Sequence, residues 1–237
     1  MRAWLWAAVL IVLAAAVGMA CGGGGDDDGG GAEPTPDRQT LEAMLKNITL
    51  NIEDLPGSFN ILQEGFIDNE QAAAIDPEGP TKGKERMDGW HRLLGYEVRF
   101  MATDPVGAFQ KGGIATITSN ISIFADEQGA IGALQWGRDL LSNPAEAATI
   151  IPGVTEMEGG PMSFTTIGDE TTASEFTGMY RAEDFQVNVP FTAHVVVIRH
   201  GRGEAHITVS AIGGAKPGPE VEQLVRLVDE RLGQALD

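Results

Sequence analysis

Residues 193–212 read AHVVVIRHGRGEAHITVSAI, and this stretch predicts a β-hairpin. Two runs rich in β-branched residues, 193–200 and 204–212, flank a short glycine-containing segment, which is typical of antiparallel strands joined by a tight turn. We expect Gly201 and Arg202 to form the centre of that turn. An antiparallel sheet is therefore the starting point for the fold.

The hairpin also predicts its own register. With the turn centred as above, Arg199 lies opposite Glu204, and Ile198 lies opposite Ala205. Opposite charges then pair on one face and apolar side chains pair on the other, as expected of a hairpin in the right register.

The rest of the body alternates between helical and strand patterns. Apolar residues at helical spacing predict three helices, at 41–48, at 130–141 after an Asp126 cap, and from Pro219 to the end of the chain. Period-two alternation predicts further strands at 94–100, 115–124, 162–167 and 174–181. The expected fold is α+β, with a single, mainly antiparallel sheet packed by about three helices as an α/β sandwich. Residues 64–89 show neither pattern, and we expect a long loop over the sheet there.

Composition excludes several classes of protein. The 237 residues carry 34 acids and 16 bases, for a net charge of −18, which argues against nucleic-acid binding because phosphates are met by basic surfaces. The single cysteine, Cys21, rules out a disulfide framework within the chain, a cysteine-based zinc site and an iron–sulfur cluster.

The N-terminus has the pattern of an export signal. A charged start at Arg2 is followed by an apolar run over 3–17 and then by Gly18-Met19-Ala20-Cys21. This stretch resembles a bacterial lipoprotein signal, although Gly18 stands where that family usually has Leu. The resemblance implies cleavage before Cys21, acylation of that residue with palmitate or a similar chain, and attachment to the extracytoplasmic face of the cell membrane. An uncleaved anchor helix and a plain secretory signal are the alternatives.

A flexible segment follows the cysteine. Residues 22–31 read GGGGDDDGGG, and such a Gly/Asp segment cannot bury a core. We therefore expect a signal peptide at 1–20, an acylated cysteine and tether at 21–37, and a single α+β envelope domain at 38–237. The three aspartates of the tether lack the spacing of a calcium loop.

The sequence predicts neither a catalytic residue, nor a metal site, nor a cofactor. His194 and His200 fall on one face of the predicted hairpin and His206 on the other, so they cannot share one ion. The chain has no G-x-S-x-G elbow and no H-E-x-x-H motif.

The weak candidates for ligand binding lie in and beside the predicted long loop. Lys82, Lys84 and Arg86 form a local basic cluster that could receive an acidic partner or headgroup, or could simply be solvated. Trp90 could line a cleft, although filling the core is the commoner role of a tryptophan.

Four segments together resemble a broader group. They are Ile52-Glu53-Asp54-Leu55-Pro56-Gly57, Ser122-Ile123-Phe124-Ala125-Asp126, Ile167-Gly168-Asp169-Glu170 and the hairpin at 195–210. The pattern is similar to envelope lipoproteins of the actinobacterial type and to extracellular sensor domains of some bacterial Ser/Thr kinases. The resemblance implies a compact α/β sandwich with a groove that binds and does not catalyse.

The predicted function is that of a lipid-anchored extracytoplasmic lipoprotein with a non-catalytic binding or interaction role. Its partner would be an apolar ligand, an envelope component or an envelope protein, and the membrane is reached through Cys21. The alternatives are an envelope enzyme, most simply a hydrolase with an unrecognised site, and a structural or assembly lipoprotein.

Overall fold

The structure is a computed structural model that describes residues 36–111, 113–148, 154–182, 187–213, 216 and 218–236. The predicted signal peptide, Cys21 and most of the tether lie outside these residues. Asp37, placed in the tether by the sequence, is the N-cap of the first helix, where its side chain accepts a hydrogen bond from the Thr40 amide.

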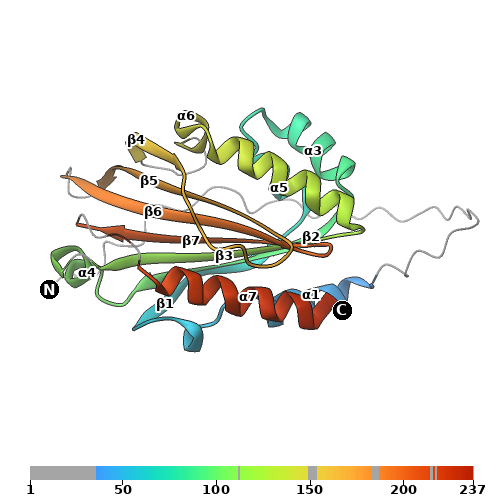
Figure 1. Ribbon diagram of the computed structural model, residues 1–237, viewed down its shortest axis with the longest axis horizontal. Helices are drawn as coiled ribbons and strands as arrows, with labels where there is room; N and C mark the ends of the chain where they lie inside the picture. The colour runs from blue at the N-terminus through green and yellow to red at the C-terminus, as the bar shows by residue number, and fades with distance from the viewer. Residues whose placement is uncertain are drawn as a thin grey trace, which may run out of the picture. The chain divides into compact units, whose positions relative to one another are not determined.

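The described residues form one antiparallel sheet of seven strands in the order β1-β2-β3-β7-β6-β5-β4 (Figure 1). The strands are β1 Phe59–Ile67, β2 Arg92–Ala102, β3 Ile114–Phe124, β4 Val154–Pro161, β5 Glu170–Ala182, β6 Val187–His200 and β7 Gly203–Ile212. The predicted hairpin is β6–β7, and its register is confirmed, since Arg199 pairs with Glu204 and Ile198 with Ala205.

Seven α-helices and one 3₁₀ turn accompany the sheet within the described residues. They are α1 Arg38–Ile48, η1 Ile52–Asp54, α2 Asn69–Ala74, α3 Pro80–Gly89, α4 Pro105–Lys111, α5 Glu127–Leu141, α6 Pro144–Ala147 and α7 Glu220–Leu236. The three helices that the sequence predicts are α1, α5 and α7. The predicted α+β class is therefore confirmed.

Two predictions about local structure are wrong. Residues 64–89 hold the end of β1 and the helices α2 and α3 instead of a long loop. The strand pattern of β1 is weak because β1 is an edge strand with exposed Ile61 and Leu62. The helices are short and start at local signals, a capping box at Asp68 and a proline at the first position of α3.

The other error concerns residues 162–167, which are not a strand. Their apolar members Met162 and Phe164 pack against the hydrophobic core, which explains the alternating pattern. Apart from the Met162 amide, which donates to the Ala173 carbonyl oxygen (2.9 Å), the segment forms no strand ladder with the described residues. The neighbouring edge strand is β4, whose residues are half-buried or exposed and include two glycines and a proline. Burial alone can thus imitate the pattern of a paired strand.

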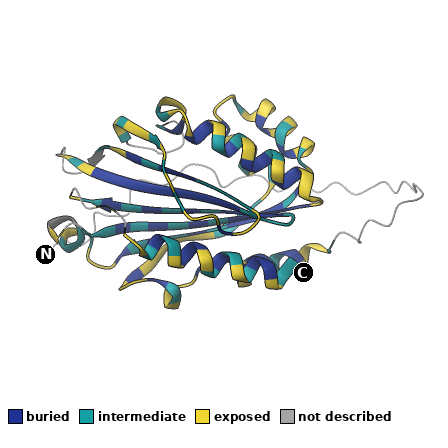
Figure 2. Ribbon diagram, in the orientation of Figure 1, coloured by how far each residue is buried: buried dark blue, intermediate teal, exposed yellow. Residues whose placement is uncertain are grey.

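Helices lie on both sides of the sheet (Figures 1 and 2). On one side, called here the core face, α1 and α7 seal a large apolar cluster. Its fully buried sheet residues include Phe100, Ile117, Ile121, Val196, Ile198, Ile207 and Val209. On the other side, called here the open face, α5 and α6 cover β5 and β6 through a smaller cluster that includes Leu134, Phe176 and Val195.

The helix α5 begins and ends as the sequence predicts. Asp126 caps it by accepting a hydrogen bond from the Gly129 amide (2.8 Å), and the helix ends at Ser142 before Pro144 starts α6. Gly129 allows a close approach, because a Cβ atom there would lie 1.9 Å from the Trp90 carbonyl oxygen. This contact seats α5 against the segment that joins α3 to β2.

Candidate ligand-binding surface

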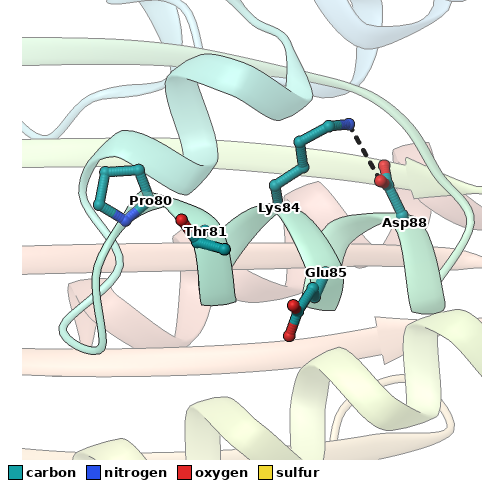
Figure 3. A pocket seen from close by; sticks show the side chains of 5 residues that line it. All are labelled: Pro80, Thr81, Lys84, Glu85 and Asp88. Atoms are coloured by element: carbon teal, nitrogen blue, oxygen red, sulfur yellow. Dashed lines mark hydrogen bonds and ion pairs between the residues drawn. The ribbon is translucent and has the colours of Figure 1, made fainter.

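The predicted basic cluster lies on α3, and its two lysines already have acidic partners. Lys82 Nζ lies 2.9 Å from Glu85 Oε2, and Lys84 Nζ lies 3.0 Å from Asp88 Oδ2. Lys84, Glu85 and Asp88 line a shallow depression together with Pro80 and Thr81 (Figure 3). The lysines are exposed and alternate with carboxylates, so this face of α3 presents no excess of positive charge.

Arg86 and Trp90 belong to a different environment. Arg86 forms ion pairs with Asp76 and Glu78, and its guanidinium carbon lies 4.8 Å from the centre of the Trp136 ring. Trp90 lies 5.9 Å from the same ring, centre to centre. These contacts join α3 to α5, which is a structural use of both side chains. The structure thus separates the four sequence candidates into two solvated lysines and two residues of a helix junction.

A different group of polar residues lies on the open face, where β2, β3 and β7 run side by side. Every second residue of these strands points to this face. Within residues 97–101, 116–120 and 206–210 those residues are half-buried, and all but Met101 are polar. We call the polar ones the polar strip. Its members are Glu97 and Arg99 on β2, Thr116, Thr118 and Asn120 on β3, and His206, Thr208 and Ser210 on β7.

The charged part of the polar strip is internally bonded. Arg99 donates a hydrogen bond from Nη2 to Glu97 Oε1 (3.1 Å), and Asn120 donates from Nδ2 to Glu97 Oε2 (3.3 Å). The side chains of Glu97 and Arg99 are 20% and 34% exposed, so both can still reach a ligand. The three residues form a prearranged set of donors and acceptors at the centre of the strip.

The hydroxyl part of the polar strip is unpartnered. Thr118 pairs in register with Thr208, and Thr116 pairs with Ser210, which sets four hydroxyl groups in two cross-strand pairs. Among the described residues none of these hydroxyls has a hydrogen-bond partner in the protein. Each hydroxyl is both a donor and an acceptor, so the four groups are available to a ligand or to water.

A buried charged row closes one end of the polar strip. Arg92 is 7% exposed and donates from Nε to Ser122 Oγ (3.1 Å), and Ser122 pairs in register with Glu204. The side chain of Glu204 is 5% exposed, and its Oε1 atom has no hydrogen bond. Burial lowers the pKa of Arg92 to about 10, which leaves the guanidinium charged at neutral pH.

His206 joins this buried row to the strip. Its Nε2 lies 3.3 Å from Glu204 Oε1, and its side chain is 34% exposed. Burial by itself lowers the pKa of His206, but the carboxylates of Glu204 and Glu97 outweigh it, so the pKa lies above its ordinary value of 6.5. The helix α5 borders the ring, since a Cβ atom at Gly137 would lie 3.9 Å from His206 Cε1.

The four histidines lie apart from one another. Each has its own carboxylate within 3.3 Å: His91 with Asp126, His194 with Glu175, His200 with Asp229, and His206 with Glu204. Within the residues that the structure describes, no group of three His, Cys, Asp or Glu side chains is arranged to hold a metal ion.

A second depression lies at the far ends of β2, β3 and β7, beside the start of α7. This open cleft has a volume of about 380 Å³, within the range of small-ligand sites. Its lining is Pro56, Gly57, Ser58, Phe59, Ala102, Gly113, Ile114, Ala211, Lys216, Gly218 and Glu220. The ammonium of Lys216 is already bound to Glu175 at 2.7 Å, so the cleft offers fewer free polar groups than the strip.

Comparisons with known proteins give one structural likeness to report. No protein-family model matches the chain, and no curated protein matches it. The chain is similar to the extracellular domain of the Ser/Thr kinase PknH from Mycobacterium tuberculosis, at 9% identity and a TM-score of 0.49, over 86% of this chain and 100% of that one. This neighbour is of one of the two kinds that the sequence motifs resemble. A likeness of this strength carries no argument about function, so the surfaces above are judged by their own chemistry.

No helix among the described residues is both long and apolar enough to cross a membrane.

The sequence did not single out the polar strip as a site. The alternation of Thr116, Thr118 and Asn120 with apolar residues was visible, but it indicated only a half-buried strand. Which strands lie beside β3, and which helix covers them, depends on pairings between residues far apart in the chain. One sequence signal could have indicated this surface. In the second strand of the hairpin, His206, Thr208 and Ser210 alternate with apolar residues in the same way.

Proposed function

We propose that this protein is a lipid-anchored, extracytoplasmic binding lipoprotein that contacts an envelope component through the polar strip. The observation that carries the proposal is the set of four unpartnered hydroxyls beside the bonded Glu97, Arg99 and Asn120. Polar groups that are fixed in position but not used within the fold are what a binding surface needs.

A solvated sheet face is the ordinary alternative, because antiparallel sheets commonly leave one face in water. The buried charged row argues for more than that. Burying the Glu204 carboxylate, whose Oε1 atom lies 3.3 Å from the His206 ring but forms no hydrogen bond, costs stability, and a merely solvated face gains nothing from it. Groups of this kind concentrate at functional sites, where they set charge and orientation.

The proposed role is non-catalytic. The carboxylate of Glu97 is held by Arg99 and Asn120, and that of Glu204 lies against His206. Carboxylates engaged in this way serve to position neighbouring groups and to accept hydrogen bonds. An envelope hydrolase is the competing reading, and it predicts an activity that is lost with one side chain of the strip.

The anchor is the second part of the proposal. We propose that acylated Cys21 holds the protein at the membrane and that residues 22–37 act as a tether. An acidic chain of net charge −18 is repelled by an anionic lipid surface, so the charge of the protein cannot supply the attachment.

Two variants test the two parts separately. Cys21→Ser should move the full chain out of the membrane fraction of cells that process lipoproteins, and unchanged partitioning would overturn lipid anchoring. For binding, the purified full chain is reconstituted into neutral phosphatidylcholine vesicles and sedimented with delipidated, insoluble envelope material. The double variant Arg99→Ala, Asn120→Ala should reduce the retained fraction about tenfold, since each lost hydrogen bond is worth about 0.5–1.5 kcal/mol or more.

A matched control comes from the other face of the sheet. Thr177 is an exposed threonine on β5, on the core-face side, and Thr177→Val should leave retention unchanged. Equal retention of the wild type and the Arg99/Asn120 variant, with both folded by circular dichroism, would overturn the polar strip as the binding surface.

A further inference from the structure

From the juxtaposition of Thr118 with Thr208 and of Thr116 with Ser210, we infer that the polar strip recognises a neutral, hydroxyl-rich chain, the glycan part of an envelope polymer. This inference rests on the proposed function and names the ligand class for the same surface. It differs from the predicted apolar ligand and from the predicted protein partner.

The geometry of the hydroxyls is the first reason. Neighbouring strands lie about 4.8 Å apart, and side chains on one face recur about every 6.7 Å along a strand, so the four hydroxyls form a small, regular lattice. A sugar ring carries hydroxyls that both donate and accept, as serine and threonine hydroxyls do. Both partners can therefore adjust their protons, and contact with the four hydroxyls themselves requires no charge to be desolvated.

The balance of charge is the second reason. Around the strip the carboxylates of Glu97 and Glu204 face the cations of Arg92 and Arg99, and His206 lies between them. The two carboxylates and the two guanidinium groups balance, and His206 adds a positive charge only when it is protonated, so the surface has little means to select a polyanion or a polycation. A polyanion is further disfavoured by the net charge of −18.

The absence of apolar anchors from the strip is the third reason. Protein interfaces concentrate their energy in buried aromatic and aliphatic side chains. The large apolar side chains that are exposed in the described part of the chain are Ile52, Ile61, Leu62, Ile75, Val106 and Ile131. All of them lie outside the strip, and the apolar side chain that shares its face opposite Thr116, Met101, is half-buried, which leaves an apolar ligand or a folded partner little to hold there.

The test uses the full chain in neutral vesicles with three preparations of delipidated envelope material. One is untreated, one is digested with a protease, and one is treated with trifluoromethanesulfonic acid, which cleaves glycosidic bonds and spares peptide bonds. We expect retention on the untreated and protease-digested material and its loss after the acid. Retention should also change little between about 0.05 M and about 0.5 M salt, because a neutral ligand is not screened.

The variant that tests the hydroxyls is Thr118→Val, Thr208→Val, which keeps the shape and the strand preference of both residues. It should weaken retention about tenfold, as expected for two lost hydrogen bonds, while Thr177→Val should not. A second variant, Thr116→Val with Ser210→Ala, guards against a local folding defect at the first pair.

The outcomes separate the inference from the proposed function. Retention that survives the acid but is lost after protease, and that still depends on Arg99 and Asn120, would overturn the glycan ligand and favour a protein partner on the same surface. Retention that depends on neither the hydroxyls nor Arg99 and Asn120 would overturn the proposed function, and the glycan ligand with it.

Discussion

The strands β3 and β7 present two unlike surfaces to the two sides of the sheet. Toward α1 and α7, Ile117 and Ile207 are fully buried in the large apolar cluster. Toward the open face, Thr118 and Thr208 are half-buried, and their hydroxyls have no hydrogen-bond partner within the described part of the chain. The same backbone thus supports both surfaces, because successive side chains point in opposite directions.

The two faces of the sheet therefore serve different purposes, one for stability and the other for the proposed binding. The core face has two long helices pressed against it, and its apolar burial is the main source of folding free energy. The open face has α5 packed mainly against β5 and β6 and also touching β7 and β3, and the polar groups of β2, β3 and β7 remain half-buried there. Changes on the first side should therefore alter stability, and changes on the second should alter binding.

The largest expected effect comes from the core face. Phe100→Ala removes a fully buried ring and should lower the free energy of unfolding by about 3–5 kcal/mol, because a cavity replaces packed atoms. Thr118→Val on the adjacent strand should change it by less than about 0.5 kcal/mol. Urea denaturation of both variants checks the contrast, and similar losses would contradict it.

The next effect concerns the buried charged row. Arg92→Ala removes hydrogen bonds to Ser122 and to the Ile67 carbonyl and takes one neighbouring cation away from the buried Glu204 carboxylate. For this reason we expect the free energy of unfolding to fall by up to about 3–5 kcal/mol. Adding Glu204→Gln should restore part of the loss. A double-mutant cycle in which the two changes are simply additive would show that the residues do not interact.

Two glycines of α5 should respond in opposite ways. Gly129→Ala places a methyl group against the Trp90 carbonyl and should cost about 1–3 kcal/mol, because the backbone on one side must move. Gly137→Ala meets only the His206 ring at ordinary contact distance and should gain about 0.5–1 kcal/mol from helix propensity. The midpoints of thermal unfolding distinguish the two variants. If both variants lost the same amount of stability, α5 would also have to pack tightly against His206.

The pH dependence should reveal the His206–Glu204 contact. The pKa of His206 is raised in the folded protein, so its contribution to stability is complete below the ordinary value of 6.5 and is lost as the pH rises through the folded pKa. His206→Gln should remove this part of the pH dependence. The measurement is the free energy of unfolding of the wild type and of His206→Gln, obtained by urea denaturation at several pH values from 6 upward. If the two plots of free energy against pH ran parallel, the raised pKa of His206 would be contradicted.

The smallest effect is expected on α3. Lys84→Ala breaks an exposed pair with Asp88 and should change the free energy of unfolding by less than about 0.5 kcal/mol, since such pairs are screened and mobile. Envelope retention should not change, because α3 lies outside the polar strip. A drop in retention would contradict this prediction and would favour the basic cluster of α3 as the binding site.

Much of the fold could be predicted because its signals are local. The hairpin β6–β7, the cap at Asp126 and the stripe of α7 each depend on residues that are close in sequence. The strand β1 could not be recognised, because an edge strand with exposed Ile61 and Leu62 lacks the alternation that burial imposes. For the opposite reason, residues 162–167 imitate a strand while they merely cover the core.

The polar strip could not be predicted from the sequence for a related reason. Lys82, Lys84 and Arg86 are close in sequence, and the sequence therefore grouped them, yet the fold sends Arg86 to a helix junction and leaves the lysines in solvent. Thr118 and Thr208 are ninety positions apart, and only the pairing of β3 with β7 sets their hydroxyls side by side.

By itself, the sequence determined the α+β class and the register of the hairpin, because each follows from the order of neighbouring residues. The export signal ending at Cys21 stays a prediction. The tertiary structure alone decided which polar residues remain available. Availability depends on what covers a face and on whether a polar group finds a partner, and both are set by strand order and helix packing across the whole domain.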